Sequence, residues 1–187
     1  MFSPYAISRE DLGLHFPRPG VPIGDNPVTE LHHSVYPAPD DHAGAIAQIY
    51  QIQNQHAGKG WNGLFYNDLL DPYSGWLYPG REHRSTSKGP PARTLCVLGD
   101  LRTDRISAAA QETIYNYATI YGGTGRLYGH QERPPNGYAT ACPGPEGMRI
   151  VDEIRQWWTP TFQDPEEDVV LFYGANNFVV GGLQLQL

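Results

Sequence analysis

Three side chains of metal-binding type stand where strand-like segments meet loops in this sequence. His32, beside a second histidine at His33, lies at the end of one strand-like segment, His130 follows another at Tyr128-Gly129-His130, and Cys142 lies in a loop rich in Pro and Gly. Two histidines and one cysteine make a good catalytic zinc set, because three protein ligands leave a fourth position for water. The spacing therefore predicts a Zn2+ site, against the common alternative that a single histidine is an ordinary surface or core residue.

The two cysteines differ in their surroundings. Cys96 lies within the apolar run Thr94–Leu98, which favours a small buried side chain. Cys142 lies in a loop, where a metal ligand or a reactive thiol is expected. Because the chain has only 2 cysteines, it cannot hold a disulfide framework, and at most one bridge could form.

Strand geometry distinguishes His32 from its neighbour His33. Successive side chains of a strand point to opposite faces, so one metal ion faces only one of the two. One face would carry Glu30, His32 and Ser34, and the other would carry Leu31, His33 and Val35. The polar face suits a cleft, so we expect His32 to be the ligand and His33 to be a packed or supporting residue.

Regular elements must position these side chains, and the hydrophobic pattern alternates between strand-like and helix-like periods. Expected strands cover Val28–Val35, Leu64–Leu70, Trp76–Tyr78, Thr94–Leu98 and Arg126–Tyr128. Expected helices cover Asp40–Gln55, Ser107–Tyr121 and Glu146–Trp158. Turn residues at 71–75 predict that the second and third strands form a hairpin. The alternation predicts an α/β domain with a mixed central β-sheet flanked by helices.

Length and charge restrict the domain organisation and the function classes. A chain of 187 residues fits one ordinary domain, which we expect over residues 1–163, with an extended arm over the first 27. Residues 164–187 begin with an acidic stretch and form a C-terminal extension or linker, either an extra hairpin or the start of a truncated unit. A net charge of −7 without any basic run argues against a nucleic-acid partner. No segment approaches the roughly 20 apolar residues of a membrane span, so no membrane partner is expected.

Six short motifs occur in the order that one protein family shows. They are Leu31-His32-His33-Ser34, Gly60-Trp61-Asn62-Gly63-Leu64-Phe65-Tyr66-Asn67, Leu77-Tyr78-Pro79-Gly80-Arg81, Cys96-Val97-Leu98-Gly99, Gly129-His130-Gln131-Glu132 and Ala141-Cys142-Pro143-Gly144. On these motifs the chain resembles the type 2 N-acetylmuramoyl-L-alanine amidase family, which includes phage lysozyme-type zinc amidases and peptidoglycan recognition proteins. The likeness spans residues 7–158 and implies a single amidase domain.

The resemblance implies roles for five residues. In that family the first histidine of the pair, the histidine of the later Gly-His and the cysteine before proline bind zinc. By resemblance these ligands are His32, His130 and Cys142. Tyr66 matches a tyrosine beside the zinc, and Thr140 matches a position that holds Lys or Thr near the developing oxyanion, so both are expected to be catalytic. The ordinary alternative for Tyr66 is an aromatic side chain in a half-buried strand.

The resemblance also implies an activity and a partner. The reaction would be hydrolysis of the amide bond between N-acetylmuramic acid and L-Ala, and the partner would be bacterial peptidoglycan, a glycan strand with its stem peptide. We expect a phage endolysin, held in the host cytoplasm until it is released to the cell wall. Two alternatives stay open. One is an amidase built into the virion, with phage structural proteins as partners, and the other is a module that binds peptidoglycan without cutting it.

Four further residues carry weaker expectations. Asp68 replaces a commonly apolar residue and, by strand alternation, is expected on the same face as Tyr66, where it would alter the cleft. Glu132 is expected to be structural rather than a catalytic base. Trp61 and Arg81 would line the groove, the alternatives being a core tryptophan and a solvated arginine. The inserted residues 134–137 make the geometry of the loop before Cys142 harder to predict.

Overall fold

A computed structural model describes residues 5–16, 22–23, 27–81, 92–132, 137, 139–157, 170–173 and 177–180. Residues 82–91, the inserted residues 134–136 and the acidic stretch 164–168 lie outside the described residues. The side chains of residues 157, 170–173 and 177–180 are likewise outside the description.

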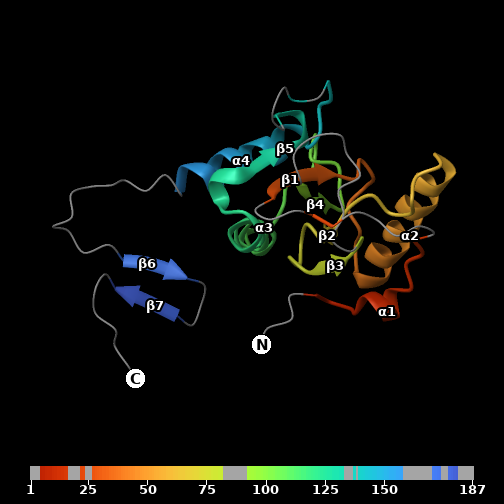
Figure 1. Cartoon of the computed structure of the whole chain (residues 1–187), viewed down its shortest axis with the longest axis horizontal. Helices are drawn as coiled ribbons and strands as arrows, with labels where there is room; N and C mark the ends of the chain where they lie inside the picture. The colour runs from red at the N-terminus through yellow and green to blue at the C-terminus, as the bar shows by residue number, and fades with distance from the viewer. Residues whose placement is uncertain are drawn as a thin grey trace.

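The centre of the domain is a mixed five-stranded sheet with the strand order β3-β2-β4-β1-β5. Its strands are β1 (Val28–His33), β2 (Asp68–Leu70), β3 (Leu77–Pro79), β4 (Ala92–Val97) and β5 (Leu127–Gly129). β1 runs parallel to both β4 and β5, β2 runs parallel to β4, and β3 pairs antiparallel with β2. The expected hairpin and the expected mixed α/β sheet are both confirmed (Figure 1).

Two expected strands are shorter than the sequence predicted. The strand expected from Leu64 begins only at Asp68. The preceding loop is held instead by the Arg81 guanidinium, which donates hydrogen bonds to the carbonyl oxygens of Leu64 and Asn62. The strand expected to reach Val35 ends at His33, and Val35 adopts a positive φ of 65° that no strand residue has.

Among the described residues, four α-helices accompany the sheet, and side-chain caps explain where three of them begin. They are α1 (Arg9–Leu12), α2 (His42–Gly58), α3 (Ala108–Tyr121) and α4 (Gly144–Trp157). Ser8, Asp41 and Ser107 accept hydrogen bonds from backbone N–H groups in the first turns of α1, α2 and α3. Short 3-10 helices cover Thr124–Arg126 and His130–Glu132.

The sheet separates two apolar layers. α2 covers one face, and α3 with α4 covers the other (Figure 1). The α2 face buries Leu12, Ala45, Ile49, Ile52, Leu64, Leu69, Tyr78, Cys96 and Leu98. The opposite face buries residues of β1, β4 and β5 together with the inner sides of α3 and α4. Period-two alternation therefore decides which helix layer each strand residue faces.

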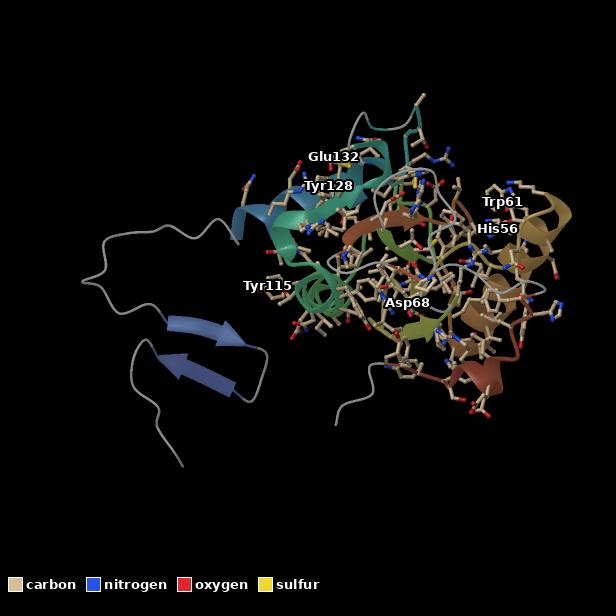
Figure 2. The ribbon with its side chains drawn as sticks, viewed as in Figure 1. His56, Trp61, Asp68, Tyr115, Tyr128 and Glu132 are labelled. Atoms are coloured by element: carbon tan, nitrogen blue, oxygen red, sulfur yellow. The ribbon has the colours of Figure 1, made fainter. Side chains whose placement is uncertain are left out.

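Asp68 faces the α3 layer, which contradicts the expectation that it would lie in the cleft beside Tyr66. Its carboxylate pairs with Arg93 at 2.8 Å and accepts hydrogen bonds from Tyr5 and Tyr117, and its side chain is fully buried (Figure 2). The expectation failed because Tyr66 precedes β2, and strand alternation does not extend to residues outside the strand.

The two ends of the chain add short elements. Tyr5 forms a parallel bridge with Leu77, and Arg9 donates to the carbonyl of Gly80, so the described part of the arm packs along β3. β6 (Val170–Tyr173) and β7 (Asn177–Val180) pair antiparallel, which is the hairpin alternative for this segment. In the described part of the chain, no helix has the length and apolar character needed to cross a bilayer.

Candidate metal centre

Two neighbouring parallel strands bring the two candidate histidine ligands together. In the register of β1 and β5, Leu31 lies opposite Gly129, so His32 and His130 follow at adjacent positions. Their ring centroids are 4.4 Å apart. Gly129 permits this arrangement, because a Cβ there would lie 2.9 Å from Pro143 Cδ and would also meet the sulfur of Met148. The segment that leads into α4 therefore packs directly against the end of β5.

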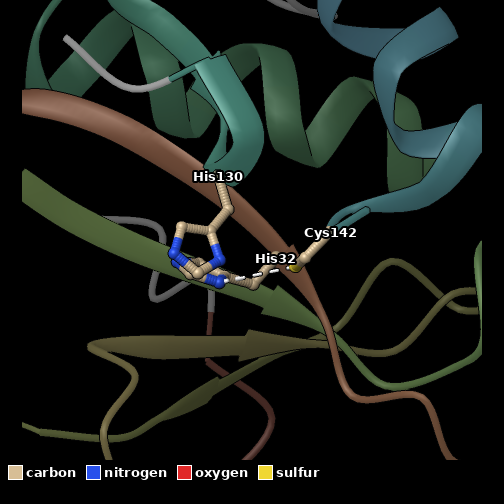
Figure 3. A group of neighbouring side chains, drawn as sticks. All are labelled: His32, His130 and Cys142. Carbon is tan, nitrogen blue, oxygen red and sulfur yellow. Dashed lines mark hydrogen bonds between the residues drawn. The ribbon is translucent and has the colours of Figure 1, made fainter. Parts of the chain in front are cut away.

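A returning loop adds the third side chain. The backbone N–H of Gln131 donates to the carbonyl of Cys142 at 2.9 Å, which ties this loop to the chain after His130. Cys142 Sγ lies 3.6 Å from His32 Nδ1, as the dashed line in Figure 3 marks. The candidate ligand atoms of His32, His130 and Cys142 all lie within 4.8 Å of one another. The structure thus places all three residues named from the sequence in one cluster.

The spacing and chemistry of these donors fit zinc. Zn–N and Zn–S bonds of ordinary length at a tetrahedral angle put the nitrogen and the sulfur about 3.6 Å apart. The separation of His32 Nδ1 from Cys142 Sγ matches this value. Two imidazoles and one thiolate are also a donor set that suits zinc, and a three-residue set leaves room for a fourth ligand.

The electrostatics of His32 favour a positive charge in this cluster. Burial alone lowers the pKa of this imidazole, but the close contacts with Cys142 and Glu30 and the charge of Glu30 outweigh burial and raise the pKa to about 9. The groups around His32 therefore stabilise its protonated, positively charged form.

His33 points to the opposite side of the sheet, as strand alternation predicted. Its Nδ1 accepts a hydrogen bond from the backbone N–H of Leu101 at 3.1 Å and lies 3.5 Å from Asp100 Oδ1. Burial lowers the pKa of His33 and outweighs the opposing effect of Asp100, so the ring is held as a neutral acceptor. Val35 does not join this packed face: its side chain is 49% exposed beyond the end of the strand.

The cluster opens into a cleft of about 750 Å³ that contains both expected catalytic residues. The ring centroid of Tyr66 lies 5.1 Å from that of His32. Burial, with the nearby sulfurs of Cys96 and Cys142, raises the pKa of Tyr66 well above its usual value, so its hydroxyl stays a donor. The hydroxyl of Thr140 accepts from the N–H of Cys142 at 3.2 Å, which leaves its own O–H to donate.

An aromatic wall forms one side of the cleft. Trp61, which is 45% exposed, and the buried His56 stack with ring centroids 4.7 Å apart at the end of α2 (Figure 2). His56 Nδ1 accepts from the backbone N–H of Phe65 at 3.1 Å, and burial lowers the pKa of His56 to about 4. The groove-lining alternative holds for Trp61. Sequence reasoning missed His56, because its place beside this loop is set by the turn after α2.

Two other expectations are decided by polar contacts. Arg81 is 4% exposed and is neither a groove residue nor a solvated one. Its guanidinium donates hydrogen bonds to carbonyl oxygens of the loop before Tyr66. Glu132 pairs with Arg155 at 2.8 Å and accepts from the N–H of Gly129 at 3.1 Å. These contacts favour the expected structural role of Glu132, which is labelled in Figure 2.

No family model matches this sequence, and no curated protein matches it. Solved structures do match the fold. A mutant of Drosophila PGRP-LB in complex with tracheal cytotoxin aligns with a TM-score of 0.65 and 23% identity, covering 81% of this chain and 93% of that chain. Peptidoglycan recognition protein-LE in complex with the same ligand gives 0.65 and 20%, with coverages of 80% and 91%. N-acetylmuramoyl-L-alanine amidase LysC from Clostridium intestinale gives 0.56 and 21%, with coverages of 76% and 91%. The chain therefore has the fold of peptidoglycan recognition proteins and of this amidase, as the resemblance implied.

Proposed function

We propose that this chain is a zinc-dependent N-acetylmuramoyl-L-alanine amidase, which hydrolyses the amide bond between N-acetylmuramic acid and L-Ala in bacterial peptidoglycan. One observation carries the proposal: His32, His130 and Cys142 converge within 4.8 Å at the base of a cleft. The fold supports the same substrate class, since two of the similar structures are complexes with tracheal cytotoxin and a third is itself named as an amidase.

The residues around the cluster would have different chemical roles. His32 and His130 would bind zinc through imidazole nitrogens and Cys142 through its thiolate. Zinc, when bound, lowers the pKa of a coordinated water toward about 7 and polarises the substrate carbonyl. Tyr66 and Thr140 would then donate hydrogen bonds to the oxyanion that develops on the carbonyl oxygen. Donors fixed in place before the reaction give the largest stabilisation of such a charge. Trp61 would supply an apolar surface for the substrate.

Substitution of the two cysteines tests the proposal. We expect the purified protein to hold about one zinc per chain and to lyse peptidoglycan, and Cys142→Ser to lose both properties. The matched control is Cys96→Ser, which removes a fully buried thiol on the α2 face of the sheet without removing a ligand. Cys96→Ser should keep about one zinc per chain and lose stability. Equal loss of zinc in both variants would contradict the assignment.

The rival function is a module that binds peptidoglycan without cutting it. Such a protein would retain peptidoglycan in a pull-down assay but release no product, with or without added zinc. The phage source, the endolysin role, the location in the host cytoplasm and the virion alternative stay predictions of the family resemblance. Detection of the protein in purified phage particles would favour the virion alternative over an endolysin.

A further inference from the structure

Glu30 is a buried carboxylate directly beside the candidate zinc ligands. It lies two residues before His32 on β1, so the two side chains point to the same face of the sheet. The side chain of Glu30 is 1% exposed. Its Oε1 lies 2.9 Å from His32 Nε2 and 3.7 Å from His130 Nε2. One carboxylate oxygen therefore lies close to both imidazoles.

These contacts assign different tasks to the two nitrogens of His32. Nε2 faces Glu30, whereas Nδ1 faces Cys142 Sγ at 3.6 Å and is the nitrogen available to the metal. The carboxylate at 2.9 Å from Nε2 favours the tautomer with the proton on that nitrogen, and a carboxylate behind a histidine ligand makes the imidazole a more basic ligand. The backbone of Glu30 is fixed as well, because β1 pairs with β4 on one side and β5 on the other.

Charge balance gives Glu30 a second role. A divalent cation with one thiolate and two neutral imidazoles leaves one net positive charge in a largely buried place. The carboxylate of Glu30 cancels this charge, and buried charges are tolerated when they are paired. Glu30 borders the cleft but is only 1% exposed, and its carboxylate contacts both histidine ligands, so it acts on the ligands.

We propose that Glu30 is a positioning residue, which orients His32 and His130 as metal ligands and balances the charge of the zinc site. This inference rests on the proposed zinc-dependent function. It extends that function by adding to the site a residue that touches neither the substrate nor the reacting atoms.

Zinc affinity measured by competition with a chromophoric chelator tests the proposal directly. The variants are Glu30→Gln, which keeps the size and one acceptor oxygen but removes the charge, and Glu30→Ala, which removes both. Loss of a carboxylate behind a histidine ligand commonly weakens metal binding by about 10- to 100-fold. We expect Glu30→Gln to fall near the lower value and Glu30→Ala near the upper one. Cobalt-loaded Glu30→Gln should also show shifted absorption bands, because its imidazole ligand is less basic.

The matched control is Asp68→Asn, which neutralises a fully buried carboxylate on the other face of the same sheet. It should lower thermal stability and leave zinc affinity and the cobalt spectrum unchanged. If Glu30→Gln, which is close in shape to the native residue, binds zinc as tightly as the wild type, the positioning role is wrong while the zinc site stands. If the wild-type protein binds no zinc, the proposed function and this inference fail together.

Discussion

Replacing His32 and His33 separately, each by alanine, distinguishes a metal ligand from its packed neighbour. His32→Ala removes one of three candidate ligands and should leave the protein folded without zinc. His33→Ala should retain about one zinc per chain, because its imidazole lies on the opposite face and accepts from the N–H of Leu101. The two variants change the same residue type at adjacent positions of one strand, so each is the control for the other.

The magnitude for His33→Ala follows from two losses. The buried N–H of Leu101 loses its acceptor, which costs about 1–3 kcal/mol. The removed ring leaves space in a packed region, which adds about 2 kcal/mol. A total of about 4 kcal/mol corresponds to a fall in melting temperature of roughly 10 °C for a domain of this size. His33→Asn should recover part of the loss, because its amide oxygen can accept the same hydrogen bond.

Zinc content by atomic emission and unfolding by calorimetry give both readouts on one sample. The expected pattern is a stable, zinc-free His32→Ala protein and a destabilised, zinc-loaded His33→Ala protein. The reverse pattern would refute the strand register and the site assignment together.

Three other perturbations have defined outcomes. Gly129→Ala should lower both the melting temperature and zinc affinity, because the new Cβ would lie 2.9 Å from Pro143 Cδ; an unchanged melting curve would contradict the close packing. Val35→Gly should raise the free energy of unfolding by about 1 kcal/mol, since a β-branched residue at φ 65° is strained, whereas Val35→Ala should gain less; denaturant titration compares them. The pKa of His56 is about 4 when folded and 6.5 when unfolded, so stability present at neutral pH is lost as the pH falls through this window. His56→Gln should weaken that dependence in urea titrations of the metal-free protein, and an identical pH profile would exclude His56 as its source.

Local patterns in the sequence predicted much of the site. The donor types and their places at strand ends indicated a zinc site, and the family resemblance assigned His32, His130 and Cys142 as its ligands; the structure brings these residues together. Period-two alternation placed His33 on the far face correctly, because β1 is a regular central strand paired on both sides. The alternation between strand-like and helix-like hydrophobic periods predicted the α/β architecture, because strands and helices that bury one face carry apolar residues at these periods.

The residues that could not be predicted depend on contacts distant in the sequence. The sequence did not predict that Asp68 faces Arg93 and Tyr117. The reason is that β2 begins two residues after Tyr66, and no local pattern marks that boundary. Arg81 is buried because a loop nearly twenty residues earlier offers it carbonyl oxygens. Glu30 shares its face with His32 by simple alternation, but its contact with His130 depends on the pairing of β1 with β5.

Identification of the bond that is cut is the most direct test of the proposed amidase activity. Purified peptidoglycan is digested with the zinc-loaded protein, and the soluble products are analysed by mass spectrometry. We expect stem peptides with a free amino group on L-Ala and glycan fragments with free lactyl carboxyl groups, and neither product should form with Cys142→Ser. Products in which L-Ala stays attached to N-acetylmuramic acid, or no products at all from zinc-loaded protein, would contradict the proposed activity.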